Sequence, residues 1–374
     1  MNTHRRVLIV GGGFSGMSAA ILLAEQGNTV DLVEIDAGWR SYGAGISLNA
    51  SIFRVFDRLG ILDGFRECGA IIDGIEIRGP ADQVLAHLPT PSVMDGAPGS
   101  GGIMRPVLAR LLADRVRATA TNIALGQSFG TIADGVDGVD VTFSDGRTGT
   151  YDLVIGADGL FSSVRAAVFP NAAAPRYVGQ AVWRAVVKRP AHLPSVAMWM
   201  GPGLKLGITP VSKDESYIFL TENRPENTYV PPETQLESLK ALLGHFTAPT
   251  AQALAAELGE HSQIVYRPLE QLLLPRPWYV GRVVLIGDAV HATTPHMAAG
   301  AMIGMEDAVV LADELAAHHN VSTALDAFQS RRWERARMVV ENSGRLAEIE
   351  QGHGTPDEHR QIMGQTLGAL AQPI

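Results

Sequence analysis

Three glycine-centred motifs, spread over most of the chain in a fixed order, constrain the possible folds more than any other feature. They are Gly11-x-Gly13-x-x-Gly16 near the N-terminus, Asp158-Gly159 in the middle, and Gly287-Asp288 in the last third. Each follows a short apolar run, the pattern of a buried strand. Taken together, the three motifs predict a dinucleotide-binding fold through which a second domain is threaded.

The first motif lies in a predicted strand–helix–strand unit over residues 5–34. Gly11 permits a tight turn, Gly13 lets the backbone approach a pyrophosphate, and Gly16 lets the helix pack on the strand. The pyrophosphate then lies at the helix N-terminus, where free N–H groups and the helix dipole favour an anion. Glu34 ends the second strand, where a carboxylate hydrogen-bonds a ribose diol and repels a 2′-phosphate.

Composition limits the other possibilities. The chain has 374 residues, which is beyond the usual size of one core, and 46% of them are apolar, so we expect two joined domains. A formal charge of −9 argues against nucleic acid or an anionic membrane as a partner. Cys68 is the one cysteine, which excludes an intramolecular disulfide. No signal segment or membrane-spanning run is visible, so we expect a cytoplasmic protein.

Sequence patterns predict the remaining elements. Residues 72–88 alternate like strands that cross into a second sheet, 89–102 form a loop, and Pro106 lies in the first turn of a helix through Arg117. Further predictions, in chain order, are a β-meander over 123–150, a buried strand over 152–156, strands over 177–222, helices over 234–258, a strand over 282–286, and helices over 298–317 and 321–350. The residues from Gly352 are expected to be loose or bound to a partner.

The second and third motifs add specific side chains after buried strands. Asp158 is followed by Ser162, which can cap a helix, and by Arg165 one turn further on. Asp288 lies where a ribityl chain could be held. A helix beginning near Gly300 could present its N-terminal amides to an electron-rich ring.

These motifs, with Arg40 before Gly43-Ala44-Gly45-Ile46 and Arg105 in Arg-x-x-Leu-x-x-x-Leu, resemble the group A flavoprotein monooxygenases of the para-hydroxybenzoate and salicylate hydroxylase type, over about residues 5–345. The resemblance implies an α/β fold: a Rossmann-like FAD-binding domain of the glutathione-reductase type interleaved with a β-sheet substrate domain, plus C-terminal helices. The expected divisions are 1–71, 99–175 and 276–350 for the FAD-binding domain, 72–98 and 176–275 for the substrate domain, and 351–374 for the tail.

The resemblance also implies the cofactor and its contacts. FAD would be the bound cofactor, with NADH or NADPH docking transiently. The implied FAD-binding residues are Gly11, Gly13, Phe14, Ser15, Gly16, Glu34, Arg40, Arg105, Asp158, Asp288, Gly300 and Ala301. The family often has Gly-Gln-Gly-x-Asn in the last loop, whereas this chain has Ala299-Gly300-Ala301-Met302-Ile303, so the asparagine contact is absent.

The implied reaction is hydroxylation of a small aromatic or heteroaromatic substrate with O₂, through a hydroperoxide at flavin C4a. An epoxidase or Baeyer–Villiger-type oxygenase on the same fold is the alternative within enzymes, and a non-catalytic flavin-fold carrier or chaperone is the alternative outside them. The protein is expected to be a monomer or homodimer.

Candidate substrate-side residues come from the predicted sheet and the last loop. They are Ser47, Met198, Met200, Leu206, Tyr217 and His296, with Pro295, His296 and Tyr217 as catalytic candidates. Imidazole titrates near neutrality, so His296 could take a phenolic proton, although a purely structural hydrogen bond is an equal alternative. Arg184 could bind a substrate carboxylate, although an ion pair on the sheet surface is favoured. His291 is favoured as structural, and the spacing of His291 and His296 does not suit a helical metal pair, so no metal is predicted.

Overall fold

A six-stranded sheet forms the centre of the larger domain. In the computed structural model, which describes residues 4–41 and 43–374, the strand order is β18-β19-β12-β1-β2-β8. The bounds are β1 (Arg6–Val10), β2 (Thr29–Glu34), β8 (Asn122–Leu125), β12 (Leu153–Gly156), β18 (Tyr279–Val280) and β19 (Val283–Leu285). All neighbours are parallel except β18 and β19. The three motifs follow β1, β12 and β19, which are adjacent, so they meet at one edge of the sheet.

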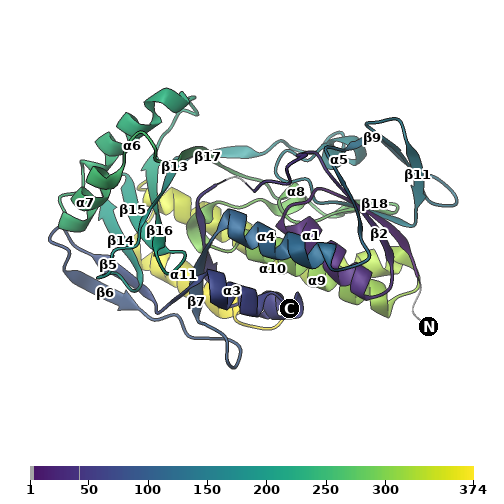
Figure 1. The fold of residues 1–374 in the computed structure, drawn as a ribbon, viewed down its shortest axis with the longest axis horizontal. Helices are drawn as coiled ribbons and strands as arrows, with labels where there is room; N and C mark the ends of the chain where they lie inside the picture. The colour runs from purple at the N-terminus through teal and green to yellow at the C-terminus, as the bar shows by residue number, and fades with distance from the viewer. Residues whose placement is uncertain (1–3, 42) are drawn as a thin grey trace.

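Long helices lie beside this sheet (Figure 1). They are α1 (Phe14–Glu25), α4 (Arg105–Arg117), α9 (Gly300–Ala317) and α10 (Val321–Glu350). Residues 17 and 19–23 of α1 are buried apolar side chains, because this helix packs against both α4 and α9. Burial on nearly all sides explains why α1 is apolar throughout rather than along one stripe.

A seven-stranded sheet forms the second domain, in the order β17-β13-β16-β15-β14-β5-β6. The bounds are β5 (Ile75–Arg78), β6 (Val84–Leu88), β13 (Arg176–Lys188), β14 (Val196–Gly201), β15 (Leu204–Pro210), β16 (Glu215–Asn223) and β17 (Ile264–Gln271). The predicted crossing of residues 72–88 into a second sheet is confirmed by the pairing of β5 with β14. The helices α6 (Gln235–Leu243) and α7 (Pro249–Glu257) cover one face, where Trp183, Trp199 and Leu206 are buried.

The opposite face of this sheet is turned toward the larger domain, and we call it the inner face. Its side chains include Val186, Tyr217 and Phe219, which pack with Ala44 and Met104 from the larger domain. The contact comes through a three-stranded sheet of β3 (Gly45–Asn49), β7 (Ser100–Met104) and β4 (Ala70–Ile72). Glycines make this approach possible: a Cβ at position 45 would collide with the Tyr217 ring, and one at position 102 with the Pro210 carbonyl oxygen.

The remaining elements are short or peripheral. They are α2 (Ile52–Arg58), α3 (Leu62–Cys68), β9 (Phe129–Asp134), β10 (Val139–Phe143), β11 (Thr148–Tyr151), α5 (Ser163–Val168), α8 (Asp288–His291), α11 (Pro356–Leu370), and the 3-10 turns η1 (Pro232–Thr234) and η2 (Pro295–Met297). The α/β fold class is therefore confirmed.

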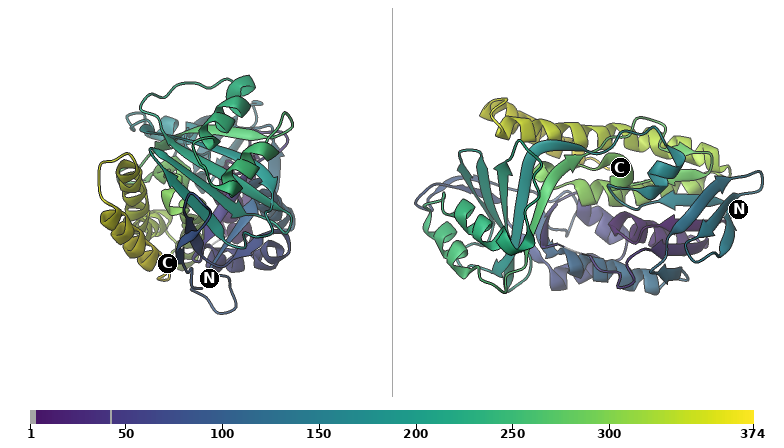
Figure 2. Two further views of the ribbon diagram at one scale, coloured as in Figure 1. Left: turned by 90° about the vertical axis from the view of Figure 1, so that its left-hand side faces the viewer. Right: turned by 90° about the horizontal axis from the view of Figure 1, so that it is seen from above.

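Two expectations were wrong in part. The segment 123–150 is not a single meander: β8 joins β2 in the large sheet, and only β9–β11 form the antiparallel unit. The residues after Gly352 are not loose, because α11 packs on α10. Ser51 donates to the Leu370 carbonyl at 2.7 Å, and Arg54 donates to the Ala371 carbonyl at 2.6 Å. Figure 2 shows α10 and α11 along one side of the molecule.

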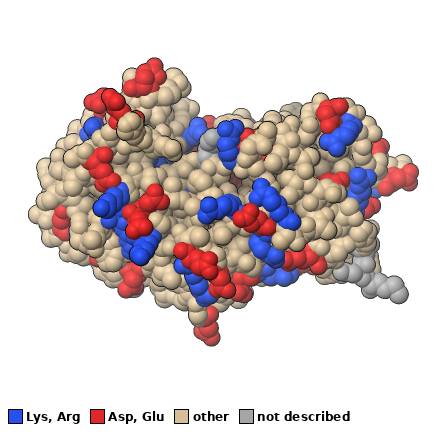
Figure 3. Space-filling view, in the orientation of Figure 1, with Lys and Arg blue, Asp and Glu red and all other residues tan. Residues whose placement is uncertain are grey.

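The surface carries charges of both signs. On the face in Figure 3, Lys and Arg are interspersed with Asp and Glu, without a large region of one sign. Within the described part of the chain, no helix combines the length and apolar character needed to cross a membrane.

Candidate functional site

The glycines of the first motif have different neighbours. Gly11 has φ +106°, and a Cβ there would lie 2.5 Å from the Ala157 carbonyl oxygen. A Cβ at Gly16 would collide with the Gly11 carbonyl oxygen, so this glycine lets α1 approach β1. By contrast, a Cβ at Gly13 would meet no described atom within 4 Å, although Gly13 immediately precedes α1. Packing within the protein thus explains Gly11 and Gly16, while Gly13 borders open space at a helix N-terminus.

Two side chains brace this loop. Glu34 accepts hydrogen bonds from the Gly12 amide at 2.7 Å and the Asp36 amide at 2.8 Å. Trp39, which the sequence analysis did not single out, donates from Nε1 to the Gly12 carbonyl at 2.8 Å. Each carboxylate oxygen of Glu34 keeps a second lone pair for a ribose hydroxyl. The acid therefore fixes the loop in addition to any role with the cofactor.

Asp158 caps the helix after the second motif. It accepts hydrogen bonds from the Ser162 hydroxyl at 2.5 Å and from the backbone amides of Ser163 and Val164. Ser162 in turn caps α5 by accepting from the Arg165 amide at 2.9 Å, as the sequence suggested. Arg165 reaches across to the Ala289 carbonyl at 2.9 Å. The second and third motifs are thereby joined.

Asp288 lies in a recess beside Arg105. Its side chain is solvent exposed, and yet desolvation by the surrounding protein raises the pKa of its carboxyl, while His291 and Arg105 act in the opposite direction. A carboxylate that is accessible to water and is also surrounded by protein atoms lies in a concave part of the surface. Burial also lowers the pKa of Arg105, against the attraction of Asp288 and Tyr217. Among residues 4–41 and 43–374, the Arg105 guanidinium has no hydrogen-bond partner, only the Phe14 ring at 5.4 Å.

Two other predicted cofactor residues make contacts inside the protein. The Ser15 hydroxyl fills the space between Gly287 and Gly304, so it joins α1 to the third motif. Arg40 is bound to Asp36 through its guanidinium, with Nη2–Oδ1 at 2.9 Å, and this pairing lowers the pKa of Asp36.

The loop between α8 and α9 carries the expected ring-binding residues. Pro295 and Ala298 are exposed, and Gly300 and Ala301 are partly buried at the start of α9. Ala298 has φ +48° and ψ +32°, a left-handed conformation that favours glycine. The first amides of α9 have no partner within the helix, so this loop presents N–H donors toward its surroundings.

A buried charge network behind this loop escaped the sequence analysis. His291 lies 2.5 Å from Asp307, which also accepts from the Gly287 amide at 2.8 Å and from Arg332 Nε at 2.7 Å. Arg332 is paired with Glu306 at 2.9 Å as well. Although desolvation alone would raise it, the pKa of Asp307 is lowered because His291 and Arg332 favour the carboxylate. The contacts of His291 are therefore with the protein itself, the arrangement that a structural role requires.

His296 is buried and turned toward α10. Its Nδ1 is 2.9 Å from the Thr294 hydroxyl, and its Nε2 is 3.3 Å from Glu350 without the angle of a good hydrogen bond. Burial lowers the pKa of His296, with a further contribution from Lys205, and Glu350 opposes this. Lys205 holds the other Glu350 oxygen at 2.5 Å. This placement favours the structural alternative over a proton acceptor, because the ring is enclosed by partners other than a ligand.

Two predicted substrate-side residues meet directly. Ser47 Oγ lies 2.8 Å from the Tyr217 hydroxyl and 3.1 Å from the Thr209 hydroxyl. This chain of hydroxyl groups spans from β3 to the inner face, and Tyr217 is buried. Thr209 was not predicted; its pairing with Tyr217 across β15 and β16 brings it there.

The other candidates divide by strand face. Met198 pairs with Gly207, which pairs with Phe219, so Met198 lies on the inner face. Met200 shares that side but is 57% exposed near the sheet edge. Leu206 points the opposite way, into the core beneath α6 and α7, and so does not border the inner face. Successive side chains of a strand point to opposite faces of the sheet, so Gly207 faces the larger domain and its neighbour Leu206 faces α6 and α7.

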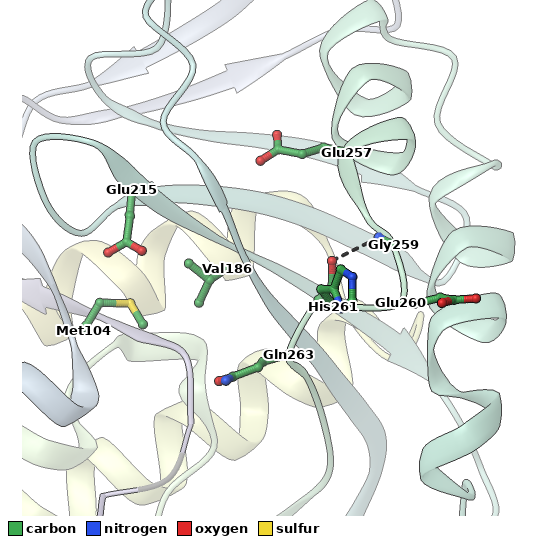
Figure 4. A pocket seen from close by; sticks show the side chains of 9 residues that line it. Met104, Val186, Glu215, Glu257, Gly259, Glu260, His261 and Gln263 are labelled. Carbon is green, nitrogen blue, oxygen red and sulfur yellow. Dashed lines mark hydrogen bonds between the residues drawn. The ribbon is translucent and has the colours of Figure 1, made fainter.

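An open cavity of about 510 Å³ begins beside the inner face at Met104 and Val186. Figure 4 shows it extending to the loop after α7, with Glu215, Glu257 and Glu260 around it. Within the described ranges, no group of three or more His, Cys, Asp or Glu side chains could hold a metal ion.

The residues present fit FAD. The open side of Gly13 at the N-terminus of α1 would accommodate a pyrophosphate, Asp288 would offer an acceptor for a ribityl hydroxyl, and Arg105 would offer a cation beside it. The start of α9 offers amides to a ring.

Comparison with known proteins supports this assignment. The family model described as "FAD binding domain" matches residues 4–343. The chain belongs to this family. It is 33% identical to the aurachin C monooxygenase/isomerase of Stigmatella aurantiaca, over 94% of this chain and 91% of that protein. It is 32% identical to the 3-amino-4-hydroxybenzoate 2-monooxygenase of Streptomyces cremeus, over 92% and 87%.

A solved structure has the same fold throughout. Klebsiella pneumoniae HpxO in complex with FAD and uric acid superposes with a TM-score of 0.84 at 25% identity, covering 99% of this chain and 94% of HpxO. The resemblance to FAD-dependent aromatic monooxygenases is confirmed. This protein is an FAD-dependent monooxygenase, and the non-catalytic carrier alternative is set aside.

Proposed function

We propose that this monooxygenase hydroxylates a small aromatic or heteroaromatic compound on the inner face, opposite the loop of residues 295–301. The Tyr217–Ser47–Thr209 hydroxyl chain carries the proposal, because it brings hydrogen-bonding groups to the apolar contact between the domains formed by Ala44, Val186 and Phe219. An apolar pocket with a few placed polar groups is the usual form of a small-molecule site.

FAD would be held by Gly13, Glu34, Arg105 and Asp288, with the ring end against the start of α9. When bound and reduced by NADH or NADPH, this cofactor supplies an electrophilic oxygen from O₂. The chain offers one glycine-rich nucleotide loop after a strand, which supports transient docking of the nicotinamide rather than a second permanent site.

The protein side chains orient the substrate and exclude water. Val186 and Phe219 would contact an aromatic ring, and Phe219 already lies 6.0 Å from Tyr217 between ring centroids. The Tyr217 hydroxyl can donate to or accept from a ring hydroxyl or ring nitrogen, while Ser47 fixes its direction. We assign His296 a positioning role, in which it holds the 295–301 loop against Glu350 and α10.

The substrates of the relatives support an aromatic substrate for this protein, although they do not identify a particular compound. The named substrates and products include an aminohydroxybenzoate and a heptyl hydroxyquinolone, and uric acid is bound in HpxO. All of these contain an electron-rich ring.

The test is oxidation of NADH and of NADPH against a panel of phenols, quinolones and heteroaromatic acids, with product detection by mass spectrometry. Wild-type enzyme should form a hydroxylated product with at least one compound. Tyr217→Phe should retain FAD and lower product yield per nicotinamide oxidised, by roughly 10- to 100-fold if the hydroxyl positions the ring. Tyr266→Phe, which removes a tyrosine hydroxyl on the opposite face of the same sheet, beneath α6 and α7, is the control. Undiminished coupling in Tyr217→Phe would remove Tyr217 from the proposal.

A further inference from the structure

Arg184 is placed on the inner face by strand alternation. It lies on β13, paired with Phe219 on β16 and Val265 on β17. Its neighbours Trp183 and Ala185 are buried beneath α6 and α7. Arg184 therefore projects to the same side as Val186, toward the larger domain.

In the part of the chain that the structure describes, the guanidinium of Arg184 lacks a partner. Within residues 4–41 and 43–374, it makes no hydrogen bond and no ion pair, contrary to the expected surface salt bridge. Two other enclosed arginines are satisfied: Arg332 by Glu306 and Asp307, and Arg165 by two carbonyl oxygens. Among the described residues, Arg184 shares its lack of a partner with Arg105, which the proposed function assigns to FAD, and Arg184 lies on the face where substrate binding is proposed.

The groups around Arg184 make the region electropositive. Desolvation lowers the pKa of Arg184, and the interaction with Tyr217 opposes this effect. The positive charges of Arg105 and Arg267 lower the pKa of Arg184 further. No carboxylate appears among these neighbours. A guanidinium remains protonated in proteins, so an enclosed one without a counter-ion is stabilised when an anion arrives.

We propose that Arg184 is a specificity-determining residue that binds an anionic group, a carboxylate, on the aromatic substrate. The planar fork of a guanidinium matches a carboxylate through two parallel hydrogen bonds, which a point charge does not provide. Tyr217 interacts electrostatically with both Arg184 and Arg105, and Arg184 pairs with Phe219 across β13 and β16, so the ring would lie along the inner face with its carboxylate at Arg184.

The substrate, rather than FAD, is the source of this anion. Arg105 is the cation that faces the recess of Asp288, and the FAD pyrophosphate belongs at the N-terminus of α1 beside Gly13. Arg184 comes from the other domain. The cavity at Glu215, Glu257 and Glu260 is not the anion position, because three carboxylates there would repel it. The inference rests on the proposed function and narrows its substrate class to aromatic acids, in contrast to neutral quinolones.

The experiment compares two probes of nearly equal shape, benzoate and benzamide, by the change each causes in the visible spectrum of the FAD-bound enzyme. Wild-type protein should bind benzoate more tightly than benzamide. Arg184→Gln should lose benzoate affinity by roughly 10- to 100-fold and keep its benzamide response and FAD content. Arg184→Lys, which keeps the charge without the fork, should be intermediate. Arg176→Gln, an exposed arginine on the same strand, should behave as wild type.

Equal responses to both probes in the wild-type enzyme, including no response to either, would overturn the inference. So would unchanged benzoate binding in Arg184→Gln. If Arg184→Gln fails to fold, Arg184→Lys and the wild-type probe comparison still decide the question. Preference for benzoate without any hydroxylated product would contradict the proposed function alone, and efficient hydroxylation of neutral and acidic rings alike would contradict this inference alone.

Discussion

Substitution of Gly13 separates a cofactor role from a structural role within one motif. In Gly13→Val, the new side chain points where no described atom lies within 4 Å, and the backbone there is extended, with φ −73° and ψ −176°. We expect the apoprotein to keep its stability within about 1 kcal/mol, because the reduced entropy of the unfolded chain offsets a poorer helix cap. In Gly16→Ala, the added Cβ meets the Gly11 carbonyl oxygen, and overpacking of this kind costs about 1–3 kcal/mol.

FAD affinity should fall more in Gly13→Val than in Gly16→Ala, the reverse of their effects on stability. The valine side chain occupies the space beside the first amides of α1, so at least one charge-assisted hydrogen bond to the pyrophosphate is lost. Such a bond contributes about 1.5–3 kcal/mol, which corresponds to a roughly 10- to 150-fold weaker affinity. Urea unfolding of the apoproteins and fluorescence titration with FAD measure the two quantities separately. The reasoning is refuted if Gly13→Val binds FAD like wild type, or if it destabilises the apoprotein as much as Gly16→Ala does.

Three further changes have defined outcomes. Asp288→Asn should weaken FAD by roughly 10-fold or more while leaving the apoprotein as stable or more stable, since a desolvated carboxylate is removed; titration and urea unfolding check this. Burial lowers the pKa of His296, so as the pH falls below about 6.5 the unfolded chain binds a proton before the folded protein does, and the free energy of unfolding decreases. His296→Gln should reduce the slope of the free energy of unfolding against pH by at most about 1.4 kcal/mol per pH unit. Equal slopes in the variant and the wild type would contradict this prediction. Asp307→Ala should cost about 3–5 kcal/mol, whereas Asp313→Ala on the same helix, with an exposed partner, should cost about 0.5 kcal/mol or less; similar losses would show that the buried network is not stabilising.

The cofactor half of the site was open to prediction because its signals are local. Gly11, Gly16 and Glu34 follow strands whose apolar runs are readable, and parallel strands bring their ends together. Ser162 was recognisable as a helix cap from its spacing alone. Trp39 was not, since nothing in the sequence marks an indole that reaches back 27 residues to the Gly12 carbonyl.

The substrate half depends on register across the sheet, which the sequence does not specify to one residue. Tyr217 and Ser47 were predicted, but the contact of Ser47 with Thr209 depends on the pairing of β15 with β16, which places Thr209 beside Tyr217. Leu206 was assigned to the wrong side for the same reason. For Arg184 and His296 the sequence left two roles open, and long-range contacts bear on each. Arg184 lacks the favoured ion pair within the described residues, and His296 lies against Glu350, which is 54 residues further along the chain.

α11 shows a further limit. Its mixed composition resembles a polar tail, but contacts from distant residues fix it to the larger domain, among them the hydrogen bonds from Arg54 and Arg335 to carbonyl oxygens near its C-terminus. Contacts from distant arginines to backbone carbonyls leave no pattern in the segment that receives them.

Oxygen-isotope transfer tests the central claim most directly. The FAD-loaded enzyme is supplied with NADH or NADPH, an aromatic acid that it turns over, and oxygen-18 gas, and the product is analysed by mass spectrometry. The account predicts a product heavier by one oxygen-18 atom, with the label on the ring. A product whose added oxygen comes from water, or nicotinamide oxidation that yields only hydrogen peroxide with every ring compound in the panel, would contradict it.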